Sequence, residues 1–214
     1  MTRVVVLGGH GKVALRLAPL LVARGDRVTA VIRNPAHEAE VAATGATSVI
    51  ADLERLGSDE LAGLLAGHDA VGWSAGAGGG SPERTYALDR DAATSSMAAA
   101  EAAGVARYVM VSYIGSRADH GVPAENPFHA YAEAKAAADD YLRNSSLAWT
   151  ILGPGPLTLD EPTGLIEVAA PGEGRVSRAD VAAVVAAVLL DDSTIGRTIA
   201  FGNGEIPIAE AIRR

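Results

Sequence analysis

The sequence predicts an α/β fold, a doubly wound parallel sheet with helices on both faces and a small C-terminal lobe. Short apolar runs rich in β-branched residues alternate with longer segments of helical spacing. The connections between these segments are short, and a glycine-rich turn follows the first apolar run. Such an alternation requires parallel strands joined by right-handed crossovers.

The first strand is predicted over residues 3–7, where a continuous β-branched and aliphatic run is typical of a strand buried on both faces. A helix is predicted over about 12–24 from the spacing of its leucines, and Pro19 is expected to kink it because proline lacks a backbone donor. Ser58 is the expected N-cap of a later helix. The next elements are predicted as strands at 27–32, 47–51 and 70–73 and helices at 35–43 and 58–66.

The second half repeats the alternation with longer loops. A glycine-rich loop at 75–82 precedes a long alanine-rich helix, and Ser177 with Asp180 has the form of a capping box at a late helix start. The predicted helices are 83–103, 128–144 and 178–190, and the predicted strands are 107–112, 149–152 and 198–201. We expect one domain over 1–214, in which residues from about 154 onward form a small lobe on the substrate side.

Composition excludes several classes of protein and site. No apolar run reaches the ~18 residues that span a bilayer, and the N-terminus has no signal-peptide layout, so we expect a cytoplasmic protein without membrane contact. The chain has no cysteine, which removes disulfides and thiolate chemistry, and no His/Asp/Glu group has metal-ligand spacing. The net charge of -8 without a basic stripe argues against nucleic acid. The expected partner is a small-molecule substrate, and the expected state is a monomer or homodimer.

The glycine-rich turn between the first strand and helix has the form G-x-x-G-x-x-A. Gly8 allows a tight exit from the strand, Gly11 removes a Cβ where a pyrophosphate approaches, and Ala14 keeps the helix close to the sheet. Exposed N–H groups and the helix dipole favour anionic phosphates there. In this context the turn predicts a Rossmann-type dinucleotide site rather than a bare turn. The assigned residues are Gly8, Gly9, His10, Gly11, Lys12 and Val13.

The end of the second strand indicates which dinucleotide is bound. An NAD site usually has a carboxylate there, whereas an NADP site has an arginine near the ribose 2′-phosphate. This strand runs into Arg33 and Asn34 with no carboxylate, so we predict NADP(H); the alternative is that Arg33 is only a solvated strand-end residue. Further along, Asp52 and Leu53 are expected beside the adenine, and Ser74, Ala75 and Gly76 under the ribose and pyrophosphate.

Tyr131 and Lys135 lie four residues apart and therefore share one helix face. Of the 18 basic residues only Lys12 and Lys135 are lysines. An ammonium near a phenol is expected to lower the pKa of the phenol, which would suit Tyr131 as a general acid or base. Ser112 ends the fifth strand and could orient a substrate carbonyl. The alternative is that Tyr131 only packs its ring and Lys135 only binds ribose.

These residues resemble the short-chain dehydrogenase/reductase superfamily, in particular its atypical NAD(P)-binding branch of NmrA-like and epimerase/dehydratase proteins. The resemblance covers nearly the whole chain and rests on the turn at 8–14, Asp52-Leu53, Ser112, Tyr131 with Lys135, and the segment 149–157. It implies that the loop after the sixth strand lies over the nicotinamide. The residues that it adds to the cofactor site are Pro154, Gly155 and Leu157, and it also assigns the ribose to Lys135.

Two departures from that family pattern bear on catalysis. Asp89 stands where the superfamily usually has an active-site asparagine, and Gly153 stands where related chains often have an arginine. The superfamily's active site usually consists of four residues, this asparagine among them, and many members of this branch lack a working set. The resemblance therefore implies cofactor binding more firmly than catalysis.

The predicted function is an NADP(H)-dependent oxidoreductase that acts on a small carbonyl or alcohol, with Ser112, Tyr131 and Lys135 as its catalytic residues. Two alternatives stay open. One is a regulatory protein that senses NADP(H) without catalysis. The other is a sugar-nucleotide epimerase or dehydratase, which the short C-terminal segment disfavours because a second nucleotide needs its own binding surface.

Overall fold

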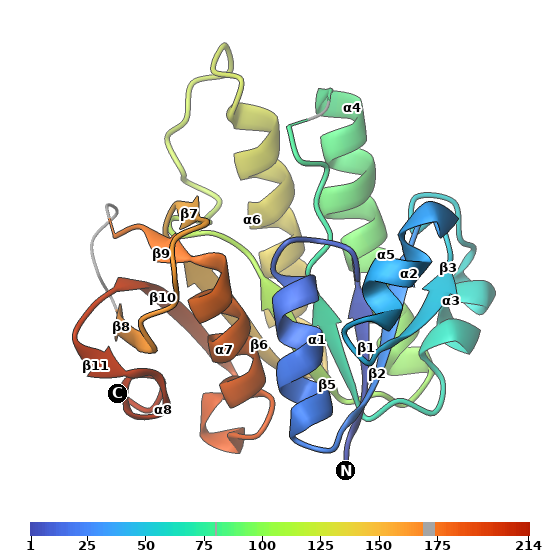
Figure 1. Cartoon of the computed structure of the whole chain (residues 1–214). Coiled ribbons are helices and arrows are strands. Elements are labelled where there is room, and N and C mark those ends of the chain that lie inside the picture. The colour runs from blue at the N-terminus through green and yellow to red at the C-terminus, as the bar shows by residue number, and fades with distance from the viewer. Residues whose placement is uncertain (80, 169–173) are drawn as a thin grey trace.

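The computed structural model describes residues 1–79, 81–168 and 174–214. Within them, a nine-stranded sheet lies between two layers of helices (Figure 1). The strands are β1 (Arg3–Leu7), β2 (Arg27–Ile32), β3 (Thr47–Ile50), β4 (Ala70–Trp73), β5 (Arg107–Val111), β6 (Ala148–Pro154), β7 (Leu157–Thr158), β8 (Leu165–Val168), β9 (Val176–Ser177), β10 (Arg197–Asn203) and β11 (Ile206–Pro207). The helical elements are α1 (Ala14–Ala23), η1 (Pro35–His37), α2 (Glu38–Ala42), α3 (Ser58–Leu65), α4 (Pro82–Thr85), η2 (Tyr86–Ala92), α5 (Ala93–Ala102), α6 (His129–Arg143), α7 (Arg178–Val188), η3 (Asp192–Thr194) and α8 (Ile208–Ala211).

The sheet has the strand order of a Rossmann fold. It runs β3-β2-β1-β4-β5-β6 and continues through β10 to β8 and β11. The pairs from β3 to β10 are parallel, whereas β8 pairs antiparallel with both β10 and β11. The strand order reverses between β1 and β4, and ligands of such sheets bind outside the carboxyl ends of the strands at that point. The predicted doubly wound α/β fold is therefore confirmed.

Each strand supplies residues to both faces of the sheet because successive side chains point to opposite sides. In β1, Val4 and Val6 enter the apolar cluster that contains residues of α1 and α7. Val5 and Leu7 enter the cluster that contains residues of α3, α5 and α6. All four are 1% exposed or less, which agrees with the prediction of a strand buried on both faces.

Three local predictions differ from the structure. The helix predicted over 83–103 is interrupted by the π-helical segment η2, whose wider turn places Asp89 in the interior. Ser58 begins α3 but does not cap it, because Gly57 is the N-cap and its N–H donates to Glu60 at 3.0 Å. Helix α1 begins at Ala14 rather than at residue 12, although Pro19 lies within it as predicted, with its side chain exposed.

Ser177 caps α7 as predicted, accepting a hydrogen bond from the Asp180 N–H at 2.9 Å. In a capping box the Asp180 carboxylate would accept from the backbone N–H of Ser177. Here it accepts from the N–H groups of Thr163 and Gly164 instead. This contact ties the start of α7 to the segment before β8. The chain after Pro154 therefore adds strands to the edge of the main sheet and also forms the small β7–β9 sheet.

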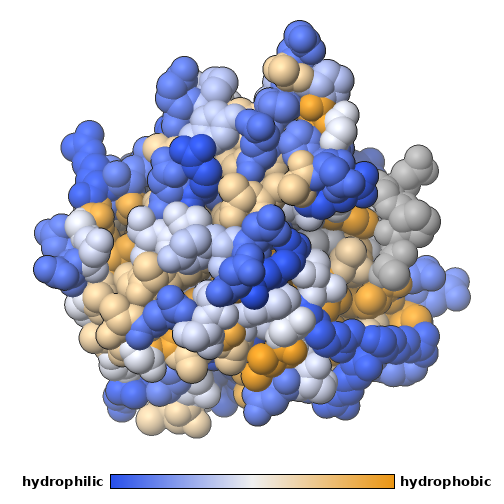
Figure 2. Space-filling model, turned by 180° about the vertical axis from the view of Figure 1, so that it is seen from behind, coloured by the Kyte–Doolittle hydropathy of each residue, from blue (hydrophilic) through white to orange (hydrophobic). Residues whose placement is uncertain are grey.

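Figure 2 shows the molecule from behind, with hydrophilic residues over most of the surface and hydrophobic residues between them. This pattern fits a chain with 26 acidic and 18 basic residues. Among the described residues, every helix is too short or too polar to cross a membrane.

Candidate cofactor and substrate site

The glycine turn joins β1 to α1 at the point where the strand order reverses. Gly8 has a φ of +85°, and a Cβ on it would lie 2.5 Å from the Cα of Ala75. A Cβ on Gly9 would lie 2.6 Å from the Cβ of Ala30 in β2, so this glycine, to which the sequence assigned cofactor binding, is required by packing against β2. The predicted tight turn is thus present.

The turn also offers donors for an anion. The N–H of Gly9 donates to Val31 and that of Gly11 donates to Gly8. Within the described residues, the N–H groups of His10, Lys12 and Val13 donate to no backbone carbonyl. Free N–H groups before the first turn of a helix are the donor set that binds phosphates. The residues present therefore fit the pyrophosphate of a dinucleotide.

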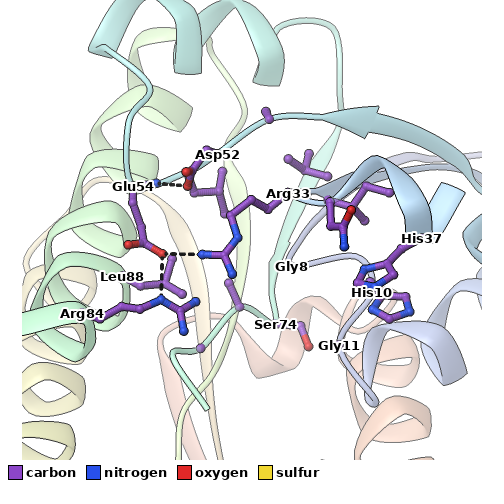
Figure 3. Close-up of a pocket in the computed structure, with 17 residues that line it drawn as sticks. Gly8, His10, Gly11, Arg33, His37, Asp52, Glu54, Ser74, Arg84 and Leu88 are labelled. Atoms are coloured by element: carbon purple, nitrogen blue, oxygen red, sulfur yellow. Dashed lines mark hydrogen bonds and ion pairs between the residues drawn. The ribbon is translucent and has the colours of Figure 1, made fainter. Parts of the chain in front are cut away.

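A cavity of about 300 Å³ opens beside this turn, on the side of β2 and β3 (Figure 3). Ten predicted cofactor residues line it: Gly8, His10, Gly11, Arg33, Asn34, Asp52, Leu53, Ser74, Ala75 and Gly76. Seven others complete the wall: Val31, Ile32, His37, Ala51, Glu54, Arg84 and Leu88. The cavity lies at the carboxyl ends of β1 to β4. An adenosine binds at this place in this kind of fold.

Two arginines and a carboxylate meet in this cavity. Arg33 Nη1 lies 3.2 Å and Arg84 Nε lies 3.3 Å from the same oxygen, Oε1 of Glu54 (Figure 3). The sequence pointed to Arg33 but missed Glu54 and Arg84. Glu54 comes two residues after the predicted Asp52, but nothing in the sequence indicated that Arg84, on α4, would reach the same place.

Two histidines stack at the other end of the cavity. The ring centroids of His10 and His37 are 3.6 Å apart, with 16° between the ring planes. His10 Nε2 also lies 2.7 Å from Oε2 of Glu40. The two stacked rings form one end of the cavity wall (Figure 3).

A second cavity, of about 730 Å³, adjoins the same turn on the side of β5 and α6. It brings together the three predicted catalytic residues, Ser112, Tyr131 and Lys135. Besides Lys135, seven predicted cofactor residues line it: Gly11, Lys12, Val13, Ser74, Ala75, Gly76 and Leu157. Asp89 and Arg178, which were not predicted as site residues, line it too.

Three predicted residues lie outside both cavity walls: Gly9, which packs against β2, and Pro154 and Gly155. Pro154 and Gly155 are buried at the end of β6, where the Pro154 carbonyl accepts from the Ile114 N–H at 2.9 Å. The Gly155 N–H donates to the Phe201 carbonyl at 2.9 Å. The structure gives both residues a role in joining β6 to its neighbours.

The pKa of Tyr131 shifts in the direction opposite to the predicted one. Burial is the largest cause that raises the pKa of its phenol, and the carboxylates of Asp89 and Asp139 raise it further. The prediction that Lys135 lowers this pKa is therefore wrong for the structure described, because loss of solvation and two carboxylates dominate. The ring packs against Tyr113 and Phe128, with centroids 5.4 and 5.2 Å away.

Lys135 is 1% exposed, in contrast to Lys12, which is exposed. Its ammonium donates to the Val111 carbonyl at 3.0 Å and lies 3.2 Å from the sulfur of Met110. Burial lowers the pKa of Lys135, while Asp139 and Asp89 oppose that shift. A buried ammonium held at the carboxyl end of β5 is placed to face a ligand in the cavity.

The Ser112 hydroxyl is already engaged. It donates to Oδ2 of Asp139 at 2.6 Å, and Ser116 donates to the same oxygen at 2.6 Å. The other oxygen, Oδ1 of Asp139, is buried without a hydrogen-bond partner among the described residues. Tyr131, Lys135 and Asp139 follow one another at intervals of four residues, so one face of α6 carries the whole group.

Asp89 completes the second cavity from η2. It is 1% exposed, and its Oδ2 accepts from the Ala77 N–H at 3.0 Å. Burial raises the pKa of Asp89, although the Ala77 N–H and Lys135 act in the opposite direction. A π-helical segment often marks a functional place, and here it aims a carboxyl group into the cavity.

Comparison with known proteins gives consistent relatives over the whole chain. A family model described as NAD(P)H-binding matches residues 8–192. The chain is 35% identical over 216 residues to an uncharacterized sugar epimerase, YhfK, of Bacillus subtilis, with 99% of both chains covered.

Two solved structures extend the comparison to the fold. A provisionally named NAD-dependent epimerase/dehydratase from Bacillus halodurans is 35% identical, with a TM-score of 0.91 and 99% of each chain covered. The oxidoreductase ylbE from Lactococcus lactis is 30% identical, with a TM-score of 0.88, and the match covers 98% of this chain and 94% of that one.

Proposed function

We propose that this chain, which belongs to the NAD(P)H-binding protein family, is an NADP(H)-dependent oxidoreductase that acts on a small carbonyl or alcohol. The observation that carries the proposal is that Ser112, Tyr131 and Lys135 line one cavity next to the glycine turn. The three side chains come from two elements, β5 with its following residue and α6, that only the fold brings to one place.

The residues divide between binding and chemistry. The N–H groups of His10, Lys12 and Val13 would hold the pyrophosphate, and the first cavity would hold the adenosine with Arg33 at the 2′-phosphate. When bound in this way, the nicotinamide accepts or supplies a hydride. Lys135 would donate to the hydroxyls of the nicotinamide ribose.

Tyr131 would move the proton. Its raised pKa keeps the phenol protonated at neutral pH, so it supplies a proton to a substrate carbonyl oxygen as a hydride reaches the carbon. This state favours carbonyl reduction over alcohol oxidation, which needs a phenolate. Ser112 would bind the same carbonyl oxygen by turning its hydroxyl away from Asp139, while Ser116 still donates to that carboxylate.

The test is a fluorescence titration with NADPH and NADH. We expect the wild type to bind NADPH about tenfold more tightly than NADH or better, and Arg33→Ala to remove most of that preference. Arg55→Ala is the matched control, because Arg55 pairs with Asp52 beside the cavity but does not line it. Equal affinities for the two cofactors in the wild type would defeat the NADP(H) assignment, and no binding of either would defeat the whole proposal.

A regulatory protein that senses NADP(H) is the second candidate. The engaged hydroxyl of Ser112 favours it, because this hydroxyl cannot bind a substrate carbonyl without leaving Asp139. This alternative predicts unequal affinities for NADP⁺ and NADPH and no turnover with any aldehyde or ketone. Turnover that depends on Tyr131 would reject it.

The names of two relatives point to sugar epimerase or dehydratase chemistry as a third candidate. An epimerase regenerates its cofactor in each cycle, so this alternative predicts conversion of a nucleotide sugar without net formation of NAD(P)H. Incubation with UDP-glucose, followed by chromatography of the sugar, separates it from the first proposal.

A further inference from the structure

The cluster of Arg33, Glu54 and Arg84 carries an inference about how the cofactor is selected. We propose that Arg84 is a second binding residue for the ribose 2′-phosphate and that Glu54 competes with this phosphate for both arginines. The inference rests on the proposed use of NADP(H) and names two further residues that set its specificity.

The three side chains converge from separate parts of the chain. Arg33 follows β2, Glu54 lies in the loop after β3, and Arg84 belongs to α4. All three line the first cavity, and both guanidinium groups contact Oε1 of Glu54, at 3.2 and 3.3 Å (Figure 3). Two cations that share one carboxylate oxygen form a ready site for an anion.

The cluster is not balanced in charge. Two arginines face one glutamate, and the second carboxylate of the cavity wall, Asp52, has its own partner in Arg55, so the cluster carries one net positive charge. A phosphate monoester carries nearly two negative charges near neutral pH and accepts hydrogen bonds from several directions, and guanidinium groups bind it bidentately. A 2′-phosphate between the arginines therefore suits the site better than the single carboxylate that they now share.

Arg84 is held in place for this contact. Its Nη1 donates to the Ala77 carbonyl at 3.1 Å, which fixes the guanidinium at the wall of the cavity. Arg84 is 35% exposed in its side chain, less than Arg33 at 56%. A better shielded cation interacts more strongly with an anion than an exposed one does. Arg84 is thus expected to contribute at least as much as Arg33 does.

The contacts of Glu54 with Arg33 and Arg84 can be broken by a ligand at a low cost in free energy. Both arginine side chains are at least 35% exposed, and ion pairs whose cations have such access to water are weak. The Glu54 N–H donates to Asp52 at 3.2 Å, so the backbone keeps the carboxylate near the cavity even when a ligand takes its partners. The carboxylate would then repel the phosphate, which weakens NADP(H) binding while leaving NAD(H) almost untouched.

The test compares the affinities of NADPH and NADH by fluorescence titration in the wild type, Glu54→Gln and Arg84→Gln, with Arg55→Gln as the matched control. We expect Glu54→Gln to tighten NADPH about threefold to tenfold and Arg84→Gln to weaken it about tenfold or more, as for one charge-assisted contact. NADH affinity is expected to change by less than about threefold in each variant. Melting curves without cofactor check that every variant is folded.

Other outcomes reject the inference in distinguishable ways. Weaker NADH binding in Glu54→Gln would mean that Glu54 accepts from a ribose 2′-hydroxyl, and weaker NADPH binding would mean that it positions the arginines for the phosphate. An unchanged NADPH/NADH ratio in Arg84→Gln would remove Arg84 from the site while the proposed function survives through Arg33. If the wild type prefers NADH or binds neither cofactor, the proposed function itself fails.

Discussion

The hydroxyl of Ser112 donates to Oδ2 of Asp139 over 2.6 Å, in a place where Asp139 is wholly buried. The serine at the end of β5 therefore supports a carboxylate on α6 before any substrate is bound. Since a hydroxyl has one proton, Ser112 cannot donate to Asp139 and to a substrate carbonyl at once. The neighbouring donor, Ser116, allows the two roles to be separated.

Replacing each serine by alanine tests that separation. Both variants remove one hydrogen bond to Asp139, so we expect similar losses of stability, about 1 kcal/mol each, in urea denaturation. Of these two serines, Ser112 lines the second cavity and Ser116 does not. We therefore expect Ser112→Ala to lower kcat/KM for carbonyl reduction about tenfold or more and Ser116→Ala to change it about twofold at most. Equal kinetic effects would leave Ser112 with a structural role only.

Tyr131→Phe keeps the ring that packs against Tyr113 and Phe128 but removes the proton donor. We expect kcat to fall about 10²-fold to 10⁴-fold, the range for loss of general acid catalysis, with NADPH affinity within about twofold. Tyr113→Phe is the control, because Tyr113 belongs to the same aromatic group and does not line the cavity. Steady-state kinetics with an aldehyde panel measures both, and undiminished turnover in Tyr131→Phe would rule out the mechanism.

Gly9→Ala tests the contact between the glycine turn and β2. The added Cβ would lie 2.6 Å from the Cβ of Ala30 and 2.9 Å from its backbone, in a rigid sheet. We expect a loss of about 1–3 kcal/mol in the free energy of unfolding, measured by urea denaturation. Gly25→Ala separates crowding from backbone strain: Gly25 has a φ of +90°, but an added Cβ would have no atom of the described residues within 4 Å, so about 1 kcal/mol is expected there. A smaller loss for Gly9→Ala than for Gly25→Ala would contradict this account.

Asp89→Asn tests the cost of the buried carboxyl group. Burial raises the pKa of Asp89 in the folded protein above the unfolded value of about 3.9. The folded state then holds more protons than the unfolded state in the window above that value, so this group's contribution to stability falls as pH rises through the window. We expect Asp89→Asn to melt a few °C above the wild type at pH 7, with the difference shrinking toward pH 4.

Thermal melts of both proteins between pH 4 and pH 7 measure this difference. A lower melting temperature for Asp89→Asn at pH 7 would show that the attraction between Asp89 and Lys135 outweighs the burial cost. A carboxyl group kept at a net cost to stability would be expected to serve the site.

The central part of the fold was predictable from local patterns. Strand β1 has the predicted bounds, because an unbroken run of aliphatic, mostly β-branched residues is typical of a strand that neighbours cover on both sides. The strands β8 and β11 were missed. Both are short: β8 pairs with β10 and β11, and β11 pairs with β8, so each depends on distant partners and its own sequence carries little signal. The π-helical turn at Asp89 was missed for a similar reason, since the local sequence there is also compatible with an α-helix.

The sequence by itself determined the features that depend on nearby residues: the glycine turn at 8–14, the strand–helix alternation, and the four-residue spacing of Tyr131 and Lys135 on one helix face. Only the tertiary structure decided which charges meet. Glu54 lies 30 residues from Arg84, and Ser112 lies 27 residues from Asp139. The pKa of Tyr131 follows burial and two carboxylates rather than the nearby lysine. Electrostatic interactions depend on distance and on exclusion of water, and both are set by packing between distant segments.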